Sequence, residues 1–144
     1  MADAGDNMIS YPARYFAAWN SRDIDVAMQI VATHVVWSDP SLPAPLAGSE
    51  QARAFFESVW AAFPNLTFEM IGTPLLDIES RRVAHEWVMR GKDSGTGFPP
   101  GREATGNTFE IYGTDVWVVD SEGAAQSVTA YYDAGSFARQ LGLN

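Results

Sequence analysis

The stretch SEQARAFFESVWAAFP, residues 49–64, marks the boundary between two kinds of hydrophobic pattern. Its apolar residues recur at helical spacing, and one face of the helix would collect Ala52, Phe55, Phe56, Val59, Trp60 and Phe63. Pro64 ends the helix because its ring cannot continue the hydrogen-bonded turns. The spacing therefore predicts a helix from Ser49 to Phe63 and a different structure after it.

The residues before this helix carry helical patterns in shorter pieces. Ser10 can cap a helix whose first turn holds Pro12, where the missing N–H costs no hydrogen bond. Asp23 can cap a second, shorter helix. The start of the chain is small, acidic and polar, unlike a signal peptide. We therefore expect a flexible tail over residues 1–9, a single domain over residues 10–144 and a cytoplasmic protein.

After Pro64 the hydrophobic period changes to two, which is typical of strands with one buried face. The sequence predicts strands at Leu66–Ile71, Leu75–Ile78, Arg82–Lys92, Asn107–Val119 and Ala125–Tyr132. A short strand at residues 35–37, a proline-rich loop at residues 39–48 and a terminal helix at residues 133–142 complete the pattern. Helices followed by strands predict an α+β fold, with helices on one face of a curved antiparallel sheet.

Composition and charge limit the possible functions. The 144 residues are 47% hydrophobic and 19% charged, as in a globular protein, and 12% are aromatic. A net charge of −9 without a Lys/Arg run argues against nucleic acid or an anionic membrane as partner. The lack of cysteine excludes a disulfide framework and thiolate chemistry. The two histidines form no zinc-binding pattern, and no apolar run is long enough to span a membrane.

Two aspartates occupy unusual positions. Alternation over residues 108–119 places Asp115 on a face that is otherwise apolar. A buried carboxyl must take up a proton or find a donor, so Asp115 is a candidate ligand-binding group. Asp39 follows a predicted strand and precedes a proline-rich loop, a common place for a catalytic group. Both positions also suit a structural role, in which the carboxyl only accepts bonds from the backbone or a tyrosine.

Three further residues are candidates for the same site. His85 shares an apolar face with Trp87 and could exchange a proton with a ligand. Tyr15 lies on the apolar face of the first helix, where its hydroxyl needs a partner. Asp133 follows the aromatic end of the last strand. The alternatives are a satisfied core histidine, a core tyrosine and a helix N-cap.

The aromatic content is high enough to line an apolar cavity as well as to fill a core. We expect the walls of a substrate pocket to come from Trp19, Trp37, Phe55, Trp60, Trp87, Trp117 and Tyr132. Core packing alone is the alternative for each of these side chains.

Several stretches resemble the nuclear transport factor 2-like superfamily, and the resemblance covers almost the whole chain. They are Arg14–Asp23, Val35–Pro40, Leu46–Gly48 with the Phe55/Phe56 helix, Phe63–Leu66, Asp115–Trp117, Tyr132–Asp133 and Gln140–Gly142. The resemblance implies a cone-shaped α+β fold, in which three to four helices pack on a strongly bent, mostly antiparallel sheet and enclose a pocket. It also implies a homodimer paired through the outer face of the sheet, where Tyr112, Val116 and Val118 are apolar.

Two branches of the superfamily resemble different parts of the chain. Ketosteroid isomerases are similar in the first half, where Tyr15 falls on the oxyanion-hole tyrosine and Asp39 on the general base. Asp115 then falls on their protonated oxyanion-hole aspartate. SnoaL-like polyketide cyclases are similar at the end of the chain, where Asp133 falls on the acid/base of an aldol ring closure. Their histidine before this aspartate is missing, and His85 could replace it.

Both branches share one step, in which a base removes a proton α to a ketone and buried donors hold the enolate oxygen. This predicts an enzyme without metal or organic cofactor that acts on a small apolar ketone, polycyclic or otherwise polyketide-like. The base is Asp39 or Asp133, and the more specific C-terminal resemblance favours Asp133. A limonene epoxide hydrolase-like site is disfavoured, because Gly113 stands where that branch needs an arginine. A non-catalytic binding or dimerisation protein of the same fold is the alternative.

Overall fold

The computed structural model describes residues 4–96 and 101–143. Its elements, in chain order, are α1 (Ala4–Ser21), α2 (Ile24–Met28), β1 (Val31–Ser38), β2 (Leu46–Ala47), α3 (Ser49–Ala62), β3 (Thr67–Asp77), β4 (Arg82–Lys92), β5 (Thr108–Val119), β6 (Ala125–Tyr132) and α4 (Ala134–Gln140). None of the helices in the described residues is long and apolar enough to cross a membrane.

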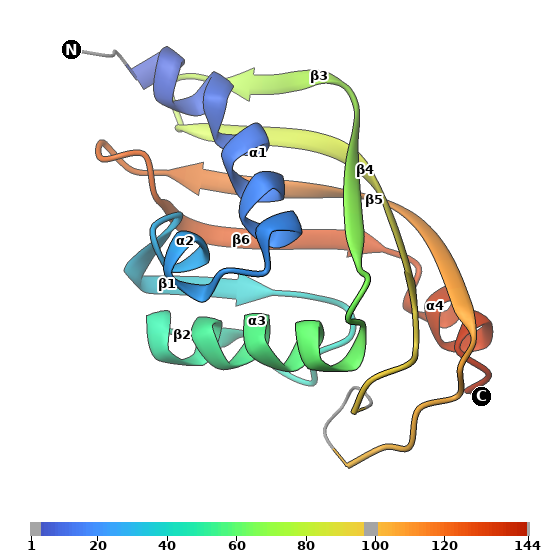
Figure 1. Cartoon of the computed structure of the whole chain (residues 1–144). Coiled ribbons are helices and arrows are strands. Elements are labelled where there is room, and N and C mark those ends of the chain that lie inside the picture. The colour runs from blue at the N-terminus through green and yellow to red at the C-terminus, as the bar shows by residue number, and fades with distance from the viewer. Residues whose placement is uncertain (1–3, 97–100, 144) are drawn as a thin grey trace.

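The strands of the described residues form one sheet in the order β2-β1-β6-β5-β4-β3. All neighbours run antiparallel except β1 and β6, which are parallel. Helices α1, α2 and α3 lie against one face of the sheet, and α4 follows β6 at the C-terminal end (Figure 1). The predicted α+β fold with a mostly antiparallel sheet is confirmed.

Strand β3 corrects one prediction, because the two strands expected between Leu66 and Ile78 are one. Its pairing with β4 continues on both sides of an irregularity between Ile71 and Leu75. Gly72 lies inside this irregularity with a φ of 74°, a conformation that glycine adopts at little cost. A bulge of this kind bends a strand, and β3, β4 and β5 curve together around the helical face (Figure 1).

The N-terminal helix begins earlier than the sequence predicts. Helix α1 starts at Ala4, so Pro12 is inside the helix rather than in its first turn. Met8 is completely buried in the core, and Asn7 donates a hydrogen bond to the Ser121 carbonyl. These tertiary contacts stabilise the first turns despite the proline. The prediction of a flexible tail is therefore wrong for residues 4–9, and residues 1–3 lie outside the described part.

The proline-rich segment also contains more regular structure than expected. Within residues 39–48, β2 pairs with the end of β1, where Trp37 faces Leu46 and Val36 faces Ala47. The Gly48 N–H donates to the Val35 carbonyl at 2.7 Å. This pairing returns the chain to the sheet edge, where α3 begins.

Helix α3 packs against β1, β2 and α2, as its apolar face predicts. Phe55, Phe56 and Val59 are buried, whereas Trp60 is only partly buried. The Trp60 indole N–H donates to the carbonyl of Trp19 on α1 at 3.0 Å, which ties α3 to α1. These contacts place the aromatic side chains of both helices over the inner face of the sheet.

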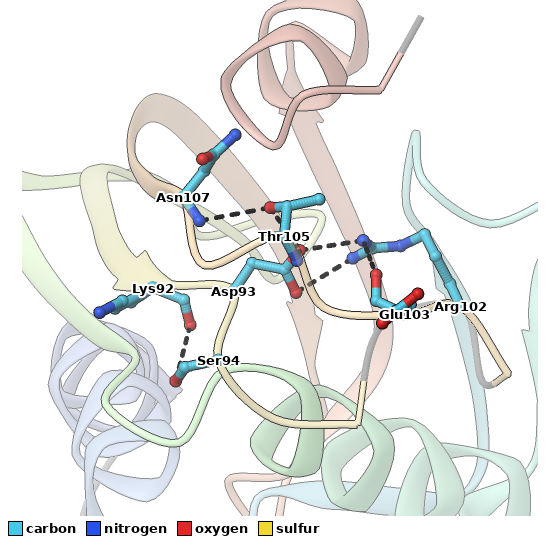
Figure 2. A network of polar contacts seen from close by, with 7 residues as sticks. All are labelled: Lys92, Asp93, Ser94, Arg102, Glu103, Thr105 and Asn107. Carbon is cyan, nitrogen blue, oxygen red and sulfur yellow. Dashed lines mark hydrogen bonds and ion pairs between the residues drawn. The ribbon is translucent and has the colours of Figure 1, made fainter.

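The connection between β4 and β5 is held by a buried carboxylate (Figure 2). Asp93 is completely buried and accepts two bonds from the Arg102 guanidinium, at 2.9 and 3.2 Å. It also accepts from the Thr105 N–H and hydroxyl, both at 2.9 Å. Although burial raises the pKa of Asp93, these donors lower it below its ordinary value. Gly95 then lies against the Ala61 carbonyl, where a Cβ would sit only 1.7 Å away.

Candidate active site

An apolar pocket lies between the helices and the inner face of the sheet. Eight of the residues predicted for a site line it: Tyr15, Trp19, Trp37, Asp39, Phe55, Trp87, Asp115 and Tyr132. Its volume is about 50 Å³, well below the roughly 300–1,000 Å³ of pockets for drug-sized ligands. Aromatic rings pack edge to face around it, with Trp37 at 6.2 Å from Trp19 and 5.2 Å from Phe55. Aromatic side chains therefore occupy most of the interior.

Asp115 is presented to this pocket by the pairing of β4 and β5. Trp87 faces Gly113 across the ladder, and its indole N–H donates to the Asp115 Oδ1 at 3.0 Å. A Cβ at Gly113 would lie 2.5 Å from the Trp87 ring. Gly113 therefore provides the space that the Trp87 ring needs to reach the carboxyl.

The electrostatic surroundings of Asp115 favour its neutral form. Burial raises the pKa of Asp115 to about 7, and the negative charge of Asp39 contributes to the increase. The hydrogen bonds from Trp87 and Tyr15 act in the opposite direction without cancelling the effect of burial. At neutral pH the carboxyl is therefore protonated in a substantial fraction of molecules and can donate a hydrogen bond.

Asp39 lies where β1 ends, beside the last residues of β6. The parallel register pairs Ser38 with Thr129, which brings Asp39 to Tyr132. The Asp39 Oδ1 accepts from the Tyr132 hydroxyl at 2.5 Å and from the Ser41 N–H at 2.8 Å. Burial raises the pKa of Asp39, while these two donors lower it. The polar contacts thus offset part of the cost of a half-buried carboxylate.

Tyr15 completes the polar group from the helical side. It is buried on α1 and packs against Trp117, with ring centroids 4.9 Å apart. Burial, together with the charge of Asp115, raises the pKa of Tyr15 well above its ordinary value. Its phenol therefore keeps its proton and serves as a hydrogen-bond donor. The structure brings Tyr15, Asp39 and Asp115 to one pocket.

Asp133 is not brought to the pocket, which corrects a prediction. Its exposed side chain caps α4 by accepting from the Ser136 N–H at 3.0 Å, and it is absent from the residues that line the cavity. The helix N-cap role, weighed as an alternative from the sequence, is the one observed. The family resemblance assigned an acid/base role to Asp133 from its position in the sequence. In the structure its side chain does not line the pocket.

Three other predicted site residues, two of them buried and one partly buried, lie outside the pocket lining. His85 is buried on β4, where its Nδ1 is 2.7 Å from the Glu86 carbonyl and its ring is 6.3 Å from that of Phe16. Trp117 is completely buried and its ring packs against that of Tyr15, whereas the partly buried Trp60 packs against Trp19. The structure therefore does not bring these three side chains into the pocket lining.

The pocket also contains residues that the sequence analysis missed, namely Ser41, Val59, Phe63, Phe68, Met89, Ala130 and Phe137. Ser41 carried a detectable signal, because an aspartate commonly accepts from the N–H two residues later in a loop. Phe137 could not be predicted, since its place depends on how α4 folds back against the sheet. Among the described residues, no group of three or more His, Cys, Asp or Glu side chains could hold a metal ion.

Comparison with known proteins identifies the family. Residues 13–127 match the SnoaL-like domain family, and the chain belongs to that family. None of the curated proteins compared with the chain matches it in sequence.

Solved structures of similar fold cover nearly the whole chain. A Xanthomonas campestris pv. campestris protein assigned as a polyketide cyclase is 20% identical, with a TM-score of 0.82, over 96% of this chain and 99% of that one. A Catenulispora acidiphila protein with a ketosteroid isomerase-like fold, in complex with trimethylamine, is 19% identical, with a TM-score of 0.76, over 93% of each chain. The epoxide hydrolase/cyclase-like enzyme SalBIII, which has a role in pyran ring formation in the polyether salinomycin, is 19% identical, with a TM-score of 0.74, over 92% of this chain and 95% of that one. At these identities the likeness concerns the fold.

Proposed function

We propose that the chain is a small-molecule enzyme that transfers a proton α to a ketone without a cofactor. The observation that carries the proposal is the meeting of two carboxyls, Asp39 and Asp115, in one apolar pocket. Their environments differ, because Asp39 accepts two hydrogen bonds at Oδ1 whereas the pKa of Asp115 is raised to about 7. Burial raises the pKa of Asp39 as well, but its two donors lower it, and two carboxyls in such different surroundings suit one base and one acid.

In this reaction the Asp39 carboxylate takes the proton from the carbon next to the carbonyl. The electron pair of the broken C–H bond moves into the carbonyl, and the developing oxyanion accepts hydrogen bonds from Tyr15 and protonated Asp115. Each well-placed donor of this kind is worth about 2.7–4 kcal/mol of barrier. Asp39 then returns the proton to the same or another carbon.

The choice of base follows from exposure and contacts. Asp39 lines the pocket, whereas Asp133 is engaged as an exposed helix cap. The site thus favours isomerase-type proton transfer by Asp39 over ring closure by Asp133. The small cavity favours a compact ketone, and a polycyclic ketone would enter only if wall residues such as Trp19 or Phe55 moved.

The test is the exchange of α-protons into deuterated water with a small cyclic ketone such as cyclopentanone. Asp39→Asn should lower the catalysed rate by about 10²–10⁴-fold, the usual contribution of a general base. Asp133→Asn is the matched control and should keep most of the rate. Equal rates in the parent and Asp39→Asn would refute the assignment of the base.

A second candidate function is non-catalytic binding of a small molecule. The tightly packed aromatic walls and the small cavity favour it, because they leave little space for a reacting substrate to move. The same experiment separates the two functions. Exchange at the buffer rate in the parent, combined with ketone-dependent quenching of tryptophan fluorescence, would support binding and exclude the enzyme.

A further inference from the structure

Two donors converge on one oxygen atom at the edge of the pocket, and a serine hydroxyl contacts one of them. Asp39 Oδ1 accepts from the Tyr132 hydroxyl at 2.5 Å and from the Ser41 N–H at 2.8 Å. The Tyr132 oxygen also lies 2.5 Å from the Ser41 Oγ. A tyrosine hydroxyl has a single proton, and here it is donated to Asp39. The Ser41 hydroxyl must therefore be the donor in its contact with Tyr132.

The result is a directed chain from the Ser41 hydroxyl to the Tyr132 hydroxyl and on to the Asp39 carboxylate. Hydrogen bonds in such a chain polarise one another and strengthen the last bond. The second oxygen of Asp39, Oδ2, has no hydrogen-bond partner among the described residues. Asp39 is thus held at one oxygen and free at the other.

We propose that Tyr132, oriented by Ser41, is a positioning residue that fixes Asp39 as the base and directs its Oδ2 at the α-proton of the substrate. This inference rests on the proposed function and deepens it, since the sequence analysis assigned Tyr132 only to substrate contact. Geometry supports the role from two sides. Tyr132 comes from β6 and Ser41 from the loop after β1, so the parallel pairing of these strands builds the chain of donors.

The groups that face Asp39 make its protonation sensitive to Tyr132. Asp115 on β5 is the neighbouring carboxyl, and Tyr15 on α1 is the other phenol at the pocket. No lysine or arginine is among the lining residues in the described part of the chain. Burial raises the pKa of Asp39, and the Tyr132 hydroxyl is the first of the two donors that lower it. Loss of that hydroxyl should raise the pKa of Asp39 further.

The first measurement is the titration of the Asp39 side-chain carboxyl in the free protein, followed by NMR of ¹³C-labelled aspartate and assigned with Asp39→Asn. Tyr132→Phe should move the titration midpoint upward. Ser41→Ala keeps the N–H donor and removes only the hydroxyl, so its midpoint should move upward by less. Tyr131→Phe is the matched control, because Tyr131 is 57% exposed. In this variant the titration midpoint of Asp39 should equal that in the parent.

The second measurement is the pH profile of α-proton exchange. The acid limb should move upward in Tyr132→Phe by the same interval as the carboxyl midpoint, and each pH unit of displacement lowers the rate at acid pH about tenfold. A residue that only contacts substrate would change KM and leave the midpoint in the free protein unmoved.

The outcomes distinguish the two proposals. If the Asp39 midpoint is displaced in Tyr132→Phe but the parent catalyses no exchange, the positioning role of Tyr132 stands and the proposed enzyme activity is refuted. Equal midpoints in Tyr132→Phe and Tyr131→Phe would overturn the positioning role whatever the activity. If Tyr132→Phe does not fold, Ser41→Ala decides, because it removes only one oxygen atom from a half-buried loop residue and keeps the N–H that donates to Asp39.

Discussion

The raised pKa of Asp115 predicts how the stability of the protein depends on pH. Asp115 holds its proton up to about pH 7 in the folded protein, whereas an exposed aspartate loses it near 3.8. Between these values the folded state binds one proton more than the unfolded state. The free energy of unfolding must therefore fall as pH rises through this window and level off above about pH 7. Asp115→Asn removes the effect, because the amide is neutral throughout and still accepts from Trp87.

The magnitude follows from the two pKa values. A difference of one pH unit corresponds to about 1.4 kcal/mol, so the full window is worth about 4 kcal/mol. Raising the pH from 5 to 8 covers only the upper part of this window, so the free energy of unfolding should fall by about 3 kcal/mol. Asp115 is buried, so solvent screening does not reduce this value appreciably. A change of this size is a large share of the stability of a small domain.

The assay is urea unfolding of the parent and of Asp115→Asn at pH 5 and pH 8. The parent should lose about 3 kcal/mol more than the variant over this interval. Asp77→Asn is the control, because hydrogen bonds from Ser80 lower the pKa of Asp77 and place its titration below the interval. Parallel pH dependence in the parent and Asp115→Asn would refute the raised pKa and remove the proposed acid.

Three further predictions concern other parts of the fold. Gly113→Ala should cost about 1–3 kcal/mol of stability and displace Trp87, because the new Cβ would lie 2.5 Å from that ring; urea unfolding and tryptophan fluorescence measure both effects. Arg102→Ala should cost about 3 kcal/mol, because it leaves the buried Asp93 carboxylate without its charged partner, whereas Arg102→Lys should recover part of the loss. We also expect two copies to pair through the outer face of the sheet, where Tyr112 is 60% exposed; light scattering should give a dimer that Tyr112→Asp dissociates.

Local sequence patterns were sufficient to predict most of the helices and strands and about half of the residues that line the pocket. Alternation along β5 placed Asp115 on the buried face, and this is confirmed because a strand has only two faces. The apolar stripe of α3 predicted its length to within one residue. Such inferences succeed because the burial of a regular element depends on its own periodicity.

The errors occurred where long-range contacts decide the structure. The contact between Asp39 and Tyr132 depends on the parallel pairing of β1 with β6, which joins segments about ninety residues apart. The sequence of neither segment alone predicts this pairing. The first turns of α1 form because Met8 enters the core, a contact that outweighs the interior Pro12. Asp133 matched a family pattern, but the direction of α4 turned its side chain into a cap.

The two carboxyls of the pocket also depend on each other. The charge of Asp39 is one cause of the raised pKa of Asp115, so an ionised Asp39 helps to keep its neighbour protonated. The donors from Tyr132 and Ser41 stabilise the charge on Asp39, and their effect therefore extends to Asp115 through that charge. A single proton distributed over two acids in identical surroundings would have no preferred site. The unequal burial of the two carboxyls gives the pair a direction, with the proposed base at the end of β1 and the proposed acid on β5.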